Sequence, residues 1–258
     1  MISKTQRNIL ISGLAQFVIG LVFFYYSDFW YLGWVAIIAI CFYTTKSLIL
    51  NKSLARIWPK AVRPSLWMFL SLFYLYLIKN VNNYTLLFFM PAALVATMSY
   101  CFVMAEELRS DKRHRIDSIL SLLLIVLAIT SSSLMQVLWH WPAVLIMAFV
   151  WLATFVIALW WLLPFMGRQE GLAAIWALVC VELVWITSRW IVLYQLPRLK
   201  FIISQPALII GSLAYSWGGM YYHHKKGTLT RPLLFEYLAV SAIVFILVVV
   251  LTKWTAGF

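Results

Sequence analysis

The sequence predicts an all-α, polytopic integral membrane protein: a helix bundle with about nine transmembrane helices and a cytoplasmic N-terminus. Hydrophobic residues make up 64% of the 258 residues and charged residues only 11%, a composition too apolar for a soluble globular protein. The apolar residues gather in runs of about 17 to 25, which is long enough to cross a bilayer core. Most charged residues lie in the short segments between these runs.

The apolar runs give the expected helices in chain order. They lie near residues 8–27, 30–50, 65–80, 84–105, 117–138, 142–164, 171–193, 202–222 and 234–252, and we expect them to form a single transmembrane domain over residues 1–258. The first run follows a short basic start without a small-residue cleavage site, so we expect a retained helix. The run at 65–80 is the weakest, because about 15 apolar residues span only roughly 22 Å.

The basic residues predict the orientation of these helices. With nine helices, most of the 20 Lys and Arg residues fall on one side of the membrane. The exceptions are Lys79, Arg189, Arg198, Lys200 and Lys253. Because basic loops stay cytoplasmic, we expect the N-terminus inside, in a plasma membrane or a bacterial inner membrane. We assign the net charge of +12 to attraction by anionic headgroups and expect no nucleic-acid partner.

The first cytoplasmic loop carries the predicted lipid contact. Between Ser47 and Pro64 the apolar side chains fall on one side of a short helix that Pro59 stops, and basic side chains fall on the rest. This pattern predicts a helix that lies in the headgroup layer. The residues expected to bind anionic lipid headgroups are Lys52, Arg56, Lys60 and Arg63.

Two segments far apart in the chain resemble each other. PAALVATMSY at 91–100 and PALIIGSLAY at 206–215 both begin a predicted span with Pro-Ala and both end in Tyr. Duplicated helical hairpins are common in transporters, so the likeness predicts an internal repeat. The alternative is that Pro in a first turn and small residues along a face are ordinary features of membrane helices.

Glu182 is the one acidic residue placed deep inside an apolar run. An ionisable residue at the centre of a bilayer costs about 2.5–3.5 kcal/mol, which makes it a functional candidate by default. Arg189 lies about 10.5 Å farther along the same predicted helix, too far for a direct pair. No Lys or Arg falls at mid-depth in another predicted span, so we expect Glu182 to carry a proton.

Other polar residues fall at a similar depth on the predicted helices, namely Gln16, Thr97, Thr130, Ser131 and Ser212. Together with Glu182 they predict a site at the membrane midplane that binds a substrate or a coupling proton. The alternative is structural: each hydroxyl bonds a carbonyl of its own helix, and Glu182 only links two helices.

A second polar cluster falls at the predicted cytoplasmic surface. Its candidate catalytic residues are Glu106, Glu107, His114, His223 and His224, as acids and bases that act on a lipid headgroup. Their spacing matches no metal-ligand set, and we expect no metal and no cofactor. The first two resemble the start of the Glu-Glu-x-x-x-Arg motif of intramembrane CAAX-type proteases, but residue 111 is Asp instead of Arg, so the match fails.

Three functions fit these patterns, and whether the protein is an enzyme stays open. The leading hypothesis is a transporter, permease or flippase subunit that moves a small molecule or lipid past polar groups around Glu182. The second is a structural or accessory subunit of a larger membrane complex, with a protein partner or a second copy packed on its helix faces. The third is a membrane-embedded enzyme that acts on a lipid-linked substrate at the cytoplasmic face. Membrane lipids are expected partners in all three.

Overall fold

A computed structural model describes residues 110–162, 170–195 and 202–251, together with helical positions between 66 and 78. This part of the chain is mostly helical, and three of its helices are long and apolar enough to cross a membrane. The spans expected near 8–27, 30–50 and 84–105 lie outside the described residues.

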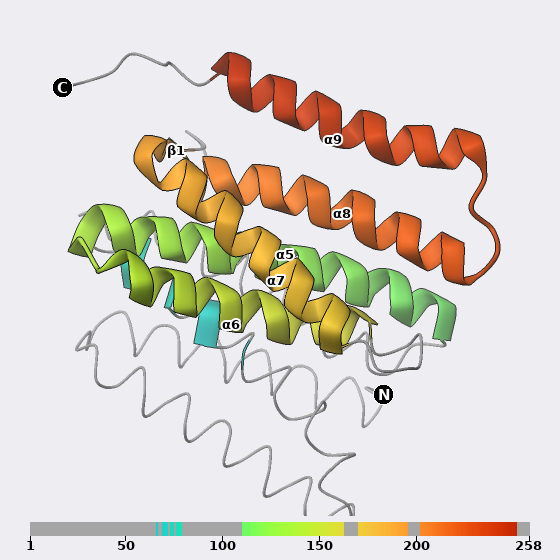
Figure 1. The fold of residues 1–258 in the computed structure, drawn as a ribbon, viewed down its shortest axis with the longest axis horizontal. Helices are drawn as coiled ribbons and strands as arrows, with labels where there is room; N and C mark the ends of the chain where they lie inside the picture. The colour runs from blue at the N-terminus through green and yellow to red at the C-terminus, as the bar shows by residue number, and fades with distance from the viewer. Residues whose placement is uncertain are drawn as a thin grey trace, which may run out of the picture. The chain divides into compact units, whose positions relative to one another are not determined.

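Five long helices follow one another from residue 110 onward (Figure 1). They are α5 (Ser110–Trp139), α6 (Ala143–Leu162), α7 (Glu170–Thr187), α8 (Gln205–Lys225) and α9 (Arg231–Leu251). A single 3-10 turn, η3 (Ser188–Trp190), and two short strands, β1 (Leu193–Gln195) and β2 (Ile202–Ser204), connect α7 to α8. Successive helices run in opposite directions, as a bundle of hairpins requires (Figure 1).

The three helices that are suited to crossing a membrane cover Ser118–Trp139, Glu170–Trp190 and Arg231–Val250. They coincide with the spans predicted at 117–138, 171–193 and 234–252. The apolar helical stretches Phe69–Ile78 and Ala143–Leu159 are shorter. α8 has 21 residues, but it is not among the described helices that combine sufficient length and hydropathy. Among the described helices, α8 therefore fits a membrane span less well than α5, α7 and α9.

The segment between α7 and α8 differs from the prediction. We expected helix up to residue 193 and again from 202, but both ends are extended and pair as an antiparallel hairpin, with Leu193 opposite Ser204 and Gln195 opposite Ile202. A short apolar run cannot be assigned to helix or strand by periodicity alone. Branched and aromatic side chains such as those of Val192, Tyr194 and Ile203 favour the pleated arrangement.

The turn between α5 and α6 is as short as the sequence WHWP predicted. α5 ends at Trp139 and α6 begins at Ala143. His140 adopts a left-handed backbone conformation with φ of 52°. The carbonyl of Pro142 then accepts from the amides of Leu145 and Ile146, at 3.0 and 3.3 Å, which closes the first turn of α6.

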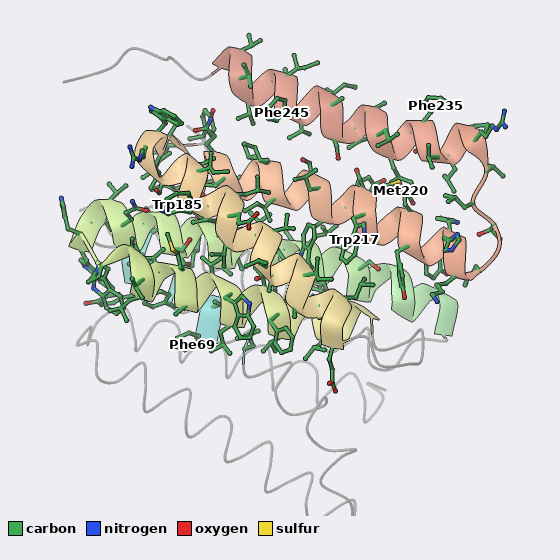
Figure 2. The ribbon with its side chains drawn as sticks, viewed as in Figure 1. Phe69, Trp185, Trp217, Met220, Phe235 and Phe245 are labelled. Carbon is green, nitrogen blue, oxygen red and sulfur yellow. The ribbon has the colours of Figure 1, made fainter. Side chains whose placement is uncertain are left out.

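The chain divides into two compact units, one of Met1–Leu120 with Leu196–Phe201 and one of Ser121–Gln195 with Ile202–Phe258. The second unit holds most of the described residues, and the single domain expected from the sequence stays a prediction. Of the candidate spans, α5 is the most enclosed: 72% of its apolar window is buried, against 6% for α9. α9 therefore exposes most of its surface, including Phe235 and Phe245 (Figure 2).

α8 is held between α7 and α9. On one side Trp217 stacks on Trp176 of α7, with ring centroids 4.9 Å apart and planes 14° apart (Figure 2). On the other side Ser216 Oγ lies 2.7 Å from the Tyr237 carbonyl oxygen and 2.6 Å from Ser241 Oγ. Ser241 Oγ also lies 3.1 Å from the Ser212 carbonyl oxygen. We call these contacts of Ser212, Ser216 and Ser241 the serine seam.

Candidate functional site

Two buried polar residues of the second unit, Thr130 and Ser204, meet where α8 begins. The amide of Ser204 donates to Thr130 Oγ1 at 3.4 Å, which joins the end of β2 to α5. Thr130 lies near the midpoint of the candidate span Ser118–Trp139. Both side chains are buried. The start of α8 is thus set opposite the middle of a membrane-length helix.

The first turn of α8 is built without a side-chain cap. Ser204 occupies the N-cap position with φ −81° and ψ 149°, the extended conformation usual for a capping serine, but its hydroxyl caps no amide. The amide of Gln205 donates instead to the Val192 carbonyl at 2.8 Å, and Pro206 has no amide hydrogen to offer. Ser204 Oγ is fully buried and has no hydrogen-bond partner within the described part of the chain.

Most other hydroxyls on these helices bond their own backbone. Ser132 and Ser133 both bond the Ile129 carbonyl, at 2.7 and 3.0 Å. Thr154 bonds the Val150 carbonyl at 2.7 Å. Ser212, one of the predicted site residues, likewise bonds the Ile209 carbonyl at 2.8 Å. These hydroxyls follow the structural alternative, in which a helix satisfies its own polar side chains.

Thr130 and Ser131 do not follow that pattern. Thr130 Oγ1 accepts from Ser204, and Ser131 Oγ is buried without a partner among the described residues. A buried hydroxyl left without a hydrogen bond costs about 1–3 kcal/mol. The cost falls on two serine hydroxyls in this unit, those of Ser131 and Ser204. Such a group calls for a functional explanation.

Glu182 lies elsewhere. It is exposed on α7, on a face with the exposed apolar side chains of Leu178, Val179, Trp185 and Ile186. The described residues offer it no hydrogen bond or ion pair. The structure therefore brings Thr130 together with Ser204 and leaves the Glu182 carboxyl group outside that arrangement. Its predicted role in binding a proton or substrate stays a prediction.

The far end of α8 carries the described part of the predicted catalytic cluster. His223 Nδ1 lies 2.9 Å from Thr228 Oγ1, across the turn that Gly227 allows with φ of 67°. His224 is exposed. Lys226 Nζ lies 4.5 Å from the centre of the Tyr222 ring. Within the described ranges no three His, Cys, Asp or Glu side chains come together as a metal site would need.

The remaining predicted residues lie where the structure says nothing of their side chains. They are Gln16, Thr97, Glu106, Glu107, and the lipid-binding candidates Lys52, Arg56, Lys60 and Arg63. His114 belongs to α5, but its side chain is not among those described. The proposed roles of all these residues stay predictions.

Ser204 is the residue that sequence reasoning missed. It falls between the apolar residues 201–203 and 207–210, which together are predicted as one span, so the expected helix begins at 202. The signal that marks it is the order Ser204, Gln205, Pro206, because a serine two places before a proline is typical of an N-cap followed by the first turn of a helix. No protein-family model, curated protein or solved structure matches the chain, so its function is argued from these residues alone.

Proposed function

We propose that the protein is an integral membrane transporter, permease or flippase subunit that moves a small molecule or lipid past a polar site at the start of α8. In this proposal about nine helices cross a plasma or bacterial inner membrane, with the N-terminus inside. The observation that carries it is the meeting of Thr130 and Ser204, two buried hydroxyl residues, opposite the midpoint of the candidate span in α5.

The interrupted geometry before α8 supports this proposal. Extended backbone at membrane depth is tolerated only where protein buries it or where it lines a cavity, because lipid offers no hydrogen bonds. In this proposal the paired strands β1 and β2, directly before the first turn of α8, form such a break. Transporters commonly place substrate and coupling ions at such breaks, near the bilayer midplane.

A transport assay that presumes no substrate tests the proposal. Membrane vesicles of both orientations, with and without the protein, are incubated in a cell extract, and mass spectrometry identifies the metabolites that the vesicles retain. We expect at least one metabolite to accumulate only with the wild-type chain. The double variant Ser204→Ala with Thr130→Val should lose that accumulation.

The matched control is Ser133→Ala with Thr154→Val, which removes the same two kinds of hydroxyl at positions where each donates to a carbonyl of its own helix. This pair should accumulate the metabolite as the wild type does. Equal vesicle contents with and without the protein, in both orientations, would count against a transport function.

The exposed carboxyl group of Glu182 favours a second candidate, an accessory subunit of a membrane complex. A polar group among apolar side chains at membrane depth is best satisfied by a hydrogen bond from another helix. Native mass spectrometry of the protein, released gently from its own membrane, tests this candidate. A stoichiometric protein partner that Glu182→Leu removes and Glu182→Gln retains would support it, and a partner-free protein would refute it.

A further inference from the structure

We propose that the N-terminal end of α8 binds a carboxylate or another singly charged anionic group of its ligand, held by the hydroxyls of Ser204 and Thr130. This inference rests on the proposed function and names the chemical class of group that the site recognises. It starts from the fully buried Ser204 hydroxyl, which has no hydrogen-bond partner within the described residues.

The backbone of α8 indicates that the ligand group is negatively charged. Aligned peptide dipoles place about half a positive elementary charge at the N-terminus of a helix, and the effect is strongest where water is excluded. α8 is 21 residues long, and Ser204, Gln205, Pro206 and Ala207 at its start are all buried. A cation at this position would be repelled, and an anion would be attracted.

The hydroxyls supply the donors. Thr130 Oγ1 accepts the amide of Ser204, so its own hydrogen is left to point toward a ligand. Ser204, the residue whose amide Thr130 accepts, offers a second hydroxyl hydrogen from its own unpartnered Oγ. Because the Ser204 side chain does not cap the helix, the amide of Ala207 in the first turn can serve as a further donor to the ligand. Hydroxyl and amide donors are the usual means of binding an oxyanion.

The size of the available charge limits the anion. Half an elementary charge from the helix offsets part of a single negative charge, and the first turn of α8, with its partner position on α5, contains no Lys, Arg or His. A dianion such as a phosphate monoester would bury a second charge without compensation, at a high cost in low dielectric. The geometry therefore points to a monoanion, with a carboxylate as the simplest example.

Binding of small probe anions to the full chain in lipid nanodiscs tests this inference without a known substrate. Sodium acetate is the probe, acetamide is its neutral control of similar shape, and inorganic phosphate is its multiply charged control, all at constant ionic strength. Thermal unfolding is followed through the fluorescence of the 14 tryptophans, and the dependence of the midpoint on probe concentration gives the affinity.

We expect acetate to raise the unfolding temperature, acetamide to leave it unchanged, and phosphate to act more weakly than acetate. Ser204→Ala should weaken acetate binding by about tenfold or more, the effect of losing a hydrogen bond to a charged group. Thr130→Val should weaken it similarly. The control variants Ser133→Ala and Thr154→Val should bind acetate as the wild type does.

Three outcomes would overturn the inference: no shift of the wild type with any probe, an equal shift with acetamide and acetate, or unchanged acetate affinity in both site variants. The result is separable from the transport proposal. Acetate binding without metabolite accumulation would keep the anion site and reject transport. Accumulation that depends on Ser204, without a preference for acetate over acetamide, would keep transport and reject the anion site.

Discussion

At the scale of single residues, Ser204 at the start of α8 and Gly219 within it differ in whether the fold needs them. Ser204 keeps a hydroxyl that the fold does not use. Gly219 provides the space that the fold needs, because a Cβ at this position would overlap the ring of Tyr237 on α9. Substitution at each residue therefore tests how much its side chain, or the lack of one, contributes to stability.

Ser204→Ala is expected to stabilise the ligand-free protein, by about 1 kcal/mol or more, because it removes a buried hydroxyl that pays a desolvation cost without a hydrogen bond. Chemical or thermal unfolding in nanodiscs measures the change. A serine that served only the fold would instead lose stability on this substitution. Ser133→Ala, which removes a hydroxyl bonded to Ile129, is the reference and should be neutral or slightly destabilising.

Gly219→Ala is expected to destabilise the packing of α8 on α9 by about 1–3 kcal/mol, since the added methyl group forces the Tyr237 ring to move. Gly171→Ala is its matched control: no atom lies within 4 Å of the added methyl group, and alanine is the better helix former. Unfolding temperatures of the two variants give the comparison. If Gly219→Ala unfolds at the same temperature as Gly171→Ala or above it, the close contact with Tyr237 does not limit stability.

At the scale of elements, the serine seam decides how α9 is held. Ser216 and Ser241 have two hydroxyl hydrogens for three short contacts, so the hydrogen bonds of one depend on those of the other. We expect a coupling of about 0.6 kcal/mol, and at most about 1.7, in a double-mutant cycle of Ser216→Ala and Ser241→Ala. The unfolding free energies of the four proteins provide it.

The same cycle made with Ser216→Ala and Ser133→Ala should be additive, because those hydroxyls share no partner. Additivity in the Ser216 and Ser241 cycle as well would mean that the two hydroxyls act independently and that the seam is not a connected network.

The helices also show which features of the fold the sequence predicted. Length and composition predicted the apolar spans within α5, α7 and α9, because a membrane-length apolar run leaves the backbone few alternatives. They did not predict that α5 begins at Ser110 or that α7 ends at Thr187. The same reasoning did not predict which face of α7 is exposed. Its buried residues, such as Ala173 and Val184, and its exposed ones, such as Ile175 and Ile186, are equally apolar. With no contrast between faces, only packing decides that Glu182 is exposed.

The candidate site was predictable in part for the same reason. Thr130 stood out because a hydroxyl in a membrane-length run is visible in the sequence. Its partner Ser204 did not, because the pairing depends on where the hairpin of β1 and β2 ends and α8 begins. A tertiary contact of this kind leaves no local periodicity. Only the order Ser204, Gln205, Pro206 hinted at it.

At the scale of the whole molecule, the hairpin of α8 and α9 has a consequence for how the chain would insert into a membrane. α9 is long and apolar enough to cross a membrane, whereas α8 falls short of the described spans in hydropathy. α8 should therefore depend on α9 for its integration into the membrane. The two helices should integrate as one hairpin, with the serine seam formed during or before release into lipid.

Truncation of the chain after Lys226 makes this dependence measurable. Engineered glycosylation sites before and after α8, translated in the presence of microsomes, report which side of the membrane each flank reaches. We expect α8 to integrate in the full chain and to fail in the truncated one. Equal integration of both would mean that α8 partitions alone. Insertion of the chain into lipid, and not only packing after folding, thus gives α9 a role.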